Sequence, residues 1–247
     1  MPLDFSAQPL YNTIRLSLGG IIINQHNRRF DTCIFDLDGT LANTLTSIAH
    51  FGNATLEHFH LPTIPTEQYK TLVGNGADKL MRRMLRTVGA QFSEERIQQF
   101  RAYYDSLYES NPMALVEPYP GIVDLLHQLK KEGFQLGVLS NKPDNVARDI
   151  VAEMFGDLFS QAHGQREGIP VKPDPTAVLE IASALGTTPD RVLYCGDSGV
   201  DMQTGKNAGM HPCGVLWGFR GEDELRENGA EFLAATAQEL YTIAVQP

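Results

Sequence analysis

The sequence predicts an α/β fold in which a doubly wound, Rossmann-like parallel sheet carries an inserted helical cap. Over 119–247, short apolar runs of strand character alternate with amphipathic helical segments, and one more such run stands at 31–36. Alternation of this kind indicates parallel strands joined by right-handed helical crossovers. The segment 44–118 has only helical periodicity. We therefore expect an α/β core built from 31–43 and 119–247, and a cap built from 44–118.

Four short runs rich in apolar residues predict the strands of the sheet. They are DTCIFD at 31–36, FQLGVLS at 134–140, RVLYCGD at 191–197 and CGVLWG at 213–218.

Seven segments with helical spacing of apolar residues predict the helices. Three lie in the expected cap, at 46–59, 77–88 and 93–108, and Ser93 is the predicted N-cap of the third. Four follow in the core, at 122–133, 143–156, 175–186 and 201–209.

Composition and charge favour a globular protein that acts on small molecules. The net charge of -10 opposes binding along a nucleic-acid backbone, which requires a basic surface. No segment approaches the roughly 20 apolar residues of a membrane span. The three cysteines form no C-x-x-C pair and are too few for a disulfide scaffold, which favours a cytoplasmic setting.

Residues 1–30 precede the predicted core as an N-terminal extension. Within it, TIRLSL at 13–18 and IIIN at 21–24 flank Gly19 and Gly20, a pair suited to a tight turn, so this segment predicts a hairpin. The extension could add an interface, and a monomer and a homodimer both remain open.

Polar and charged residues lie at the ends of the predicted strands and in the loops that follow them. In order, they are Asp36, Asp38, Ser140, Asn141, Lys142, Lys172, Asp197, Ser198 and Asp201. In open parallel sheets, ligands bind outside the carboxyl ends of the strands. Two ionised carboxylates about 5 Å apart repel by roughly 3 kcal/mol at an effective dielectric constant near 20. A divalent cation would offset this repulsion, and an all-oxygen ligand set favours Mg²⁺.

The order of these motifs resembles that of the haloacid dehalogenase superfamily. The matching features are Asp-x-Asp-Gly-Thr after a strand, Ser-Asn-Lys at a strand end, Lys172 before Pro-Asp-Pro, and Gly-Asp-Ser-x-x-Asp, in that order over 31 to 217. The resemblance implies an aspartyl-phosphate intermediate formed on Asp36, with Asp38 as the general acid and then the general base.

The resemblance also implies roles for the remaining polar residues. Ser140 and Asn141 would bind the phosphoryl group, and Lys172 would neutralise both the nucleophile and the phosphate. The metal group would comprise Asp36, Asp38 through its backbone carbonyl, Asp197, and Asp201 one step removed from the ion.

The cap segment bears on the substrate. VGNGADKLMRRML at 73–85 resembles the cap loop and helix of bacterial phosphoglycolate phosphatases, where Gly74, Asn75 and Gly76 would contact a small carboxylate. A plain turn between helices is an equal alternative for these three residues. The best single prediction is 2-phosphoglycolate; a pyrophosphatase and a sugar-phosphate phosphatase or mutase remain alternatives.

A non-enzymatic alternative is a phospho-accepting receiver, which also uses a strand-end Asp and Mg²⁺. Asp38 argues against it, because a second carboxyl beside the nucleophile serves ester cleavage rather than signalling.

One position departs from the family pattern. Asn43 stands where family members usually carry Asp, at the expected hinge between core and cap. We expect activity to survive there, with altered helix capping or cap motion.

Overall fold

The computed structural model describes residues 28–247. The hairpin predicted at 13–24 lies outside the described residues.

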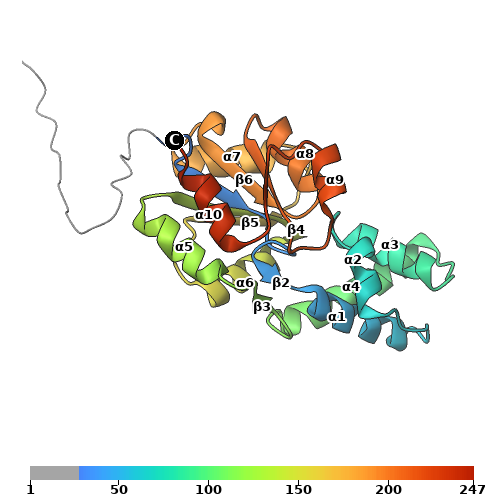
Figure 1. Ribbon diagram of the computed structural model, residues 1–247. Helices are drawn as coiled ribbons and strands as arrows, with labels where there is room; N and C mark the ends of the chain where they lie inside the picture. Colours follow the sequence, from blue (N-terminus) through green and yellow to red (C-terminus); the bar gives the residue numbers. More distant parts are fainter. Residues whose placement is uncertain (1–27) are drawn as a thin grey trace, which may run out of the picture.

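Six parallel strands form one sheet in the order β5-β4-β1-β6-β7-β8 (Figure 1). Their bounds are β1 Thr32–Phe35, β4 Gln135–Pro143, β5 Gln161–Gln165, β6 Val192–Gly196, β7 His211–Val215 and β8 Phe232–Ala234. At the centre of the sheet, Phe35 of β1 pairs with Val138 of β4 on one side and with Cys195 of β6 on the other. The end of β1 is therefore flanked directly by the ends of β4 and β6.

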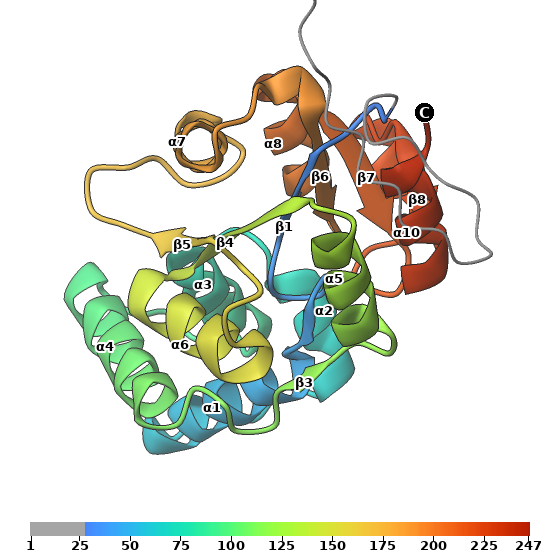
Figure 2. The same ribbon diagram turned by 90° about the vertical axis from the view of Figure 1, so that its left-hand side faces the viewer.

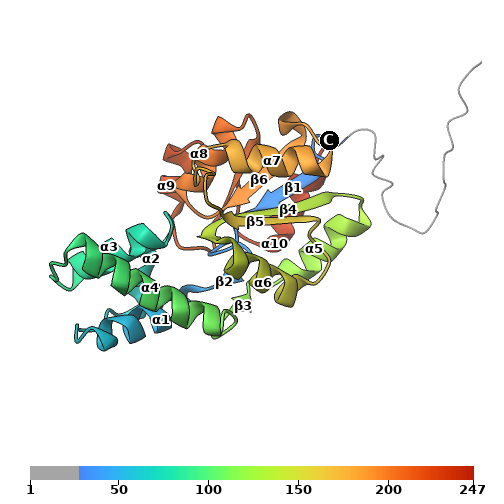
Figure 3. The ribbon, with the colours of Figure 1, turned by 180° about the vertical axis from the view of Figure 1, so that it is seen from behind.

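Helices cover both faces of the sheet, so the predicted doubly wound α/β fold is confirmed (Figures 1 and 3). On one face, α7 (Thr176–Leu185) packs Val178 and Ile181 against Ile34 and Tyr194, and α8 (Gly199–Asn207) lies beside it. The other face carries α5 (Ile122–Lys131), α6 (Asp144–Phe155) and α10 (Ala237–Val245). The short helix α9 (Glu222–Glu227) precedes β8.

Four further helices gather beyond the end of the sheet at which β1 terminates (Figures 1 and 2). They are α1 (Leu45–His58), α2 (Tyr69–Leu72), α3 (Ala77–Thr87) and α4 (Glu94–Ser110), with a 3-10 turn η2 at Thr66–Gln68. Phe59 and Phe100 pack edge to face between α1 and α4, with ring centroids 5.1 Å apart. As predicted, Ser93 caps α4, because its hydroxyl accepts a hydrogen bond from the backbone N–H of Arg96.

Two short antiparallel strands connect this helical group to the sheet. β2 (Ala42–Asn43) pairs with β3 (Glu117–Pro118), and Asn43 lies opposite Glu117. The side chain of Asn43 is exposed, and the N-cap of α1 is Thr44. The predicted effect of Asn43 on helix capping is therefore wrong, because this residue belongs to a strand and is not the N-cap; an effect on cap motion stays a prediction.

The two edge strands of the sheet, β5 and β8, were not predicted from the sequence. β5 has the sequence QAHGQ and is only partly buried, so it lacks the apolar run that marks a central strand. β8 is three residues long. Edge strands have one unpaired side and one fewer neighbour to pack against, which relaxes their composition.

In residues 28–247, no helix is both long and apolar enough to cross a membrane. Cys33, Cys195 and Cys213 are buried and make no disulfide.

Candidate active site

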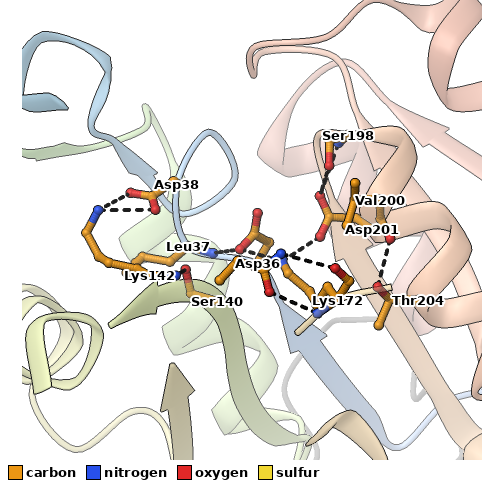
Figure 4. A network of polar contacts seen from close by, with 11 residues as sticks. Asp36, Leu37, Asp38, Ser140, Lys142, Lys172, Ser198, Val200, Asp201 and Thr204 are labelled. Carbon is orange, nitrogen blue, oxygen red and sulfur yellow. Dashed lines mark hydrogen bonds and ion pairs between the residues drawn. The ribbon is translucent and has the colours of Figure 1, made fainter. Parts of the chain in front are cut away.

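Polar side chains from three adjacent strands meet at the carboxyl end of the sheet. Figure 4 shows those of Asp36, Asp38 and Ser140 with Lys172 and Asp201. Asp36 and Asp38 follow β1, Ser140 lies near the end of β4, and Asp197 follows β6. Lys172 reaches the same place from the loop after β5. The parallel register brings these residues together, because neighbouring strands end at the same edge.

Asp36 and Lys172 form a buried ion pair at the centre of this group. Lys172 Nζ lies 2.8 Å from Asp36 Oδ1, and the two side chains are only 3% and 10% exposed. The same oxygen accepts a hydrogen bond from the backbone N–H of Leu37 at 2.7 Å. These contacts hold the carboxylate of Asp36 in one orientation at the carboxyl end of the sheet.

Asn141 fixes the backbone of Lys172. Its amide oxygen accepts from the N–H of Lys172 at 2.9 Å, and its amide nitrogen donates to the carbonyl of Lys172 at 3.3 Å. Asn141 thus holds the lysine loop against the end of β4, and both ends of its amide are used for this purpose.

Asp201 supports the ion pair from the first turn of α8. Its Oδ1 lies 2.7 Å from Lys172 Nζ, and its Oδ2 accepts from the hydroxyl of Ser198 at 2.6 Å. Burial opposes a charge on Lys172, but Asp201 and Asp36 together raise its pKa well above the ordinary value. The lysine therefore remains an ammonium at neutral pH.

Asp197 is held in a narrow backbone cradle. Its Oδ2 accepts from the N–H of Phe219 at 2.7 Å. A Cβ atom on Gly218 would lie 2.5 Å from this oxygen, and one on Gly39 would lie 2.7 Å from the carboxyl carbon. Both glycines allow the main chain to approach the carboxylate closely, and Gly39 also has a φ of 88°.

Asp36, Asp197 and Asp201 could hold a metal ion, because one carboxylate oxygen of each lies within 4.8 Å of the others. Burial and the charge of Asp201 raise the pKa of Asp36 to about 7, against the opposing effect of Lys172. Burial, followed by the charges of Asp201 and Asp36, raises the pKa of Asp197 well above its ordinary value. Buried carboxylates at this spacing require a cation or protons, and an all-oxygen donor set fits Mg²⁺.

Asp38 points away from this carboxylate cluster, toward Lys142 (Figure 4). Lys142 Nζ lies 3.0 and 3.2 Å from the two oxygens of Asp38. The ammonium also lies 4.5 Å from the ring centroid of Tyr108 on α4, a cation–π contact with the cap. Asp38 and Asp36 thus line the same cavity but have different lysine partners.

A cavity lies between these residues and the helical group. Its lining includes Asp36, Asp38, Ser140 and Lys172 from the core, with Gly74, Gly76, Leu80, Tyr104 and Tyr108 from the cap. Of the three predicted cap-loop residues, Gly74 and Gly76 thus reach the cavity, whereas Asn75 uses its side-chain oxygen to accept from Arg83 at 2.7 Å.

Arg220, in the loop after β7, connects the core with the cap loop. Its guanidinium donates to the carbonyl of Val73 at 2.8 Å and to the carbonyl of Lys70. The side chain also lines the cavity. Sequence analysis assigned no role to Arg220 or Lys142. Lys142 had one signal in the sequence, its place directly after Ser140 and Asn141. Arg220 also had one, because it lies in WGFRGEDEL, a segment similar to that of bacterial phosphoglycolate phosphatases. Its contacts with the carbonyls of Lys70 and Val73 could not be predicted, because these residues lie far away in the chain.

The chain is similar to known hydrolases over most of its length. A family model of haloacid dehalogenase-like hydrolases matches residues 33–215. A phosphoglycolate phosphatase of Haemophilus influenzae is 31% identical over 222 residues, covering 88% of this chain and 99% of that protein. One from Aquifex aeolicus is 33% identical over 188 residues, covering 75% of this chain and 84% of that protein. The crystal structure of a predicted phosphoglycolate phosphatase from Haemophilus somnus has a TM-score of 0.81 and 26% identity, covering 88% of this chain and 99% of that one.

Proposed function

Because this chain belongs to the haloacid dehalogenase-like hydrolases and is a phosphatase, we propose that it hydrolyses a small phosphomonoester through an aspartyl-phosphate on Asp36. The reaction depends on Mg²⁺, and 2-phosphoglycolate is the preferred substrate. Residues 44–118 serve as the cap over the reaction site, and the α/β core of 31–43 and 119–247 supplies the reacting groups.

One observation carries the proposal: the two carboxylates after β1 have different partners. Asp36 is paired with Lys172 beside Asp197 and Asp201, whereas Asp38 is turned toward the cavity side that holds Lys142. A nucleophile beside a metal group and a separate proton donor facing the leaving group are what a two-step ester hydrolysis requires.

In the first step, a carboxylate oxygen of Asp36 forms a bond to phosphorus while the bond from phosphorus to the ester oxygen breaks. Asp38 gives its proton to that departing oxygen, so the alcohol leaves neutral. In the second step, water attacks the phosphorus of the aspartyl-phosphate and Asp38 takes the proton of the water. The bond between phosphorus and Asp36 breaks, and inorganic phosphate leaves.

Bound Mg²⁺ would neutralise the charge of the phosphoryl oxygens and of the carboxylates. Asp36 and Asp197 would hold it directly, since their contacts with Leu37, Lys172 and Phe219 occupy one oxygen of each. The backbone carbonyl of Asp38 would be the third protein ligand, as the family resemblance implies. Asp201 acts one step removed, because Lys172 and Ser198 already bind its two oxygens.

Three residues of the core bind or position the phosphoryl group. The hydroxyl of Ser140 accepts from the N–H of Lys142 at 3.2 Å, which leaves its own proton for a phosphoryl oxygen. The Lys172 ammonium neutralises negative charge on the nucleophile and the phosphoryl group. Asn141 acts through Lys172, because its amide is bound to the lysine backbone.

Two observations support 2-phosphoglycolate as the preferred substrate. The relatives from Haemophilus influenzae and Aquifex aeolicus are named phosphoglycolate phosphatases. The cap loop lines the cavity with Gly74 and Gly76, whose backbone could contact a small carboxylate. Asn75 would support this loop from outside the cavity, because its side-chain oxygen accepts from Arg83.

Initial rates with 2-phosphoglycolate, pyrophosphate, hexose phosphates and nucleotides test the proposal. We expect Mg²⁺-dependent release of phosphate, abolished by EDTA, with 2-phosphoglycolate the fastest. Asp36→Asn should lower turnover by roughly a thousandfold or more, because no nucleophile remains. Asp223→Asn on the exposed surface of α9 is the matched control. Substantial turnover by Asp36→Asn would contradict the mechanism, and faster hydrolysis of pyrophosphate or a hexose phosphate would contradict only the substrate.

A further inference from the structure

Lys142 has a position that its contact with Asp38 does not fully explain. Its long cationic side chain is only 7% exposed, and the residue lines the cavity between the core and the cap. The carboxylate of Asp38 and the ring face of Tyr108 both lie against this ammonium and favour its charged form. A fixed positive charge therefore lies on the side of the cavity that faces the leaving group.

The distances place this charge close to the atoms next to the scissile bond. As general acid, Asp38 must come within about 3 Å of the ester oxygen. Lys142 Nζ lies 3.0 and 3.2 Å from the oxygens of Asp38. An ammonium one hydrogen bond beyond Asp38 is within reach of a substituent one carbon away from the ester oxygen.

The other cations at the cavity are engaged elsewhere. Lys172 lies between Asp36 and Asp201, and the guanidinium of Arg220 donates to the carbonyls of Lys70 and Val73. Lys142 is held by one carboxylate and one aromatic ring, and an ammonium has three N–H donors. The ammonium of Lys142 can thus donate a hydrogen bond to a second anion while it keeps its contact with Asp38.

Two cap carboxylates also line the cavity, and both have partners. Asp105 accepts from Arg101 at 2.6 Å, and Glu109 accepts from the amide of Asn145 at 3.1 Å. The negative charges of Asp105 and Glu109 would repel a carboxylate on the leaving group. A carboxylate on the substrate therefore needs a cation at this place in order to bind.

We propose that Lys142 is a specificity residue that binds a carboxylate attached to the carbon next to the ester oxygen of the substrate. It selects phosphate esters of small 2-hydroxy acids over esters of uncharged alcohols. This inference rests on the proposed function, since it assigns the part of the site that recognises the leaving group.

The test compares two esters of similar size, 2-phosphoglycolate and 2-hydroxyethyl phosphate, in which a carboxylate is replaced by an uncharged hydroxymethyl group. For each, kcat/KM is measured at saturating Mg²⁺ for the wild type, Lys142→Met and Lys142→Arg, with Lys79→Met on the exposed surface of α3 as the control. We expect the wild type to prefer 2-phosphoglycolate. Lys142→Met should reduce that preference by roughly 10- to 100-fold, the range for a lost charge-assisted hydrogen bond. Lys142→Arg should keep part of the preference, and Lys79→Met all of it.

The competing role, positioning of Asp38 alone, predicts a different result. In that case Lys142→Met lowers kcat/KM equally for both esters, the preference is unchanged, and the inference is overturned. If the wild type hydrolyses both esters equally, the inference fails while the phosphatase stands. If it hydrolyses neither ester but other phosphomonoesters, the proposed substrate fails as well. Should Lys142→Met not fold, Lys142→Gln, which keeps a donor without the charge, is measured with the same pair of substrates.

Discussion

Lys172 Nζ lies 2.8 Å from Asp36 Oδ1, and both side chains are almost fully buried. The two residues belong to distant parts of the chain, a loop after β5 and the end of β1. Each charge has little access to water, so each depends on the other and on Asp201 for its stabilisation. This relationship joins the stability of the fold to the chemistry of the site.

Replacing Lys172 with Met should destabilise the protein and abolish activity. The substitution leaves Asp36 and Asp201 without their shared counter-charge, and breaking a buried pair in this way costs about 3 kcal/mol or more. Urea unfolding measures the loss, with Lys131→Met at an exposed position as the control. An unchanged free energy of unfolding in Lys172→Met would show that the ion pair does not stabilise the fold.

Replacing Asp38 with Asn should slow both formation and hydrolysis of the aspartyl-phosphate, because the same carboxyl moves the proton in each step. General acid–base catalysis is worth about 10²- to 10⁴-fold in rate. Formation should be slowed much less for p-nitrophenyl phosphate, whose leaving group needs little protonation. Rapid-quench measurement of phosphoenzyme tests this, and an equal slowing of formation for 2-phosphoglycolate and p-nitrophenyl phosphate would argue against Asp38 as the acid.

The stability of the metal-free protein should fall as pH rises from about 4 to about 7. Burial and Asp201 raise the pKa of Asp36 to about 7, whereas an unfolded Asp titrates near pH 4. Between these values the native state binds more protons than the unfolded state, so the free energy of unfolding decreases with increasing pH. Mg²⁺ should bind the deprotonated carboxylates and so reverse the loss.

Thermal unfolding with EDTA or Mg²⁺ checks this expectation. The increase in Tm caused by Mg²⁺ should be larger near pH 7.5 than near pH 5.5, because protons compete with the metal at the lower pH. Asp36→Asn removes the titrating group and should reduce the difference. An equal increase at both pH values would mean that Asp36 does not couple protons to metal binding.

Replacing Gly218 with Ala should weaken metal binding and stability. The new Cβ would lie 2.5 Å from Asp197 Oδ2 and from the carbonyl oxygen of Gly39, so either the loop or the carboxylate must move. Such overpacking costs about 1–3 kcal/mol. Gly221→Ala, three residues along, meets no atom within 4 Å and is the matched control. The Tm of each variant is measured as Mg²⁺ is added. We expect a lower Tm and a weaker response to Mg²⁺ in Gly218→Ala than in Gly221→Ala. Equal Tm values and equal responses would exclude a tight fit of the backbone around Asp197.

The central strands were predictable from sequence because they are apolar and end in charged residues. β1 and β6 lie within the predicted runs 31–36 and 191–197, and both are buried along their length. The edge strand β5 was not predictable from sequence, because its sequence QAHGQ has no apolar pattern and the strand pairs on one side only. Asn43 was predicted to affect helix capping or cap motion; its pairing with Glu117 contradicts the first alternative, because it places Asn43 in a strand before the helix begins. Pairing of this kind depends on a segment far along the chain.

By itself the sequence determined the doubly wound fold, the family, and which side chains follow each central strand. These features are local, because a strand end and the residues after it are contiguous in the chain. Only the tertiary structure decided the partners: Asp36 with Lys172, Asp38 with Lys142 and Tyr108, and Arg220 with the carbonyls of the cap loop. Those contacts join distant segments and depend on side-chain direction and burial, which the order of residues does not specify.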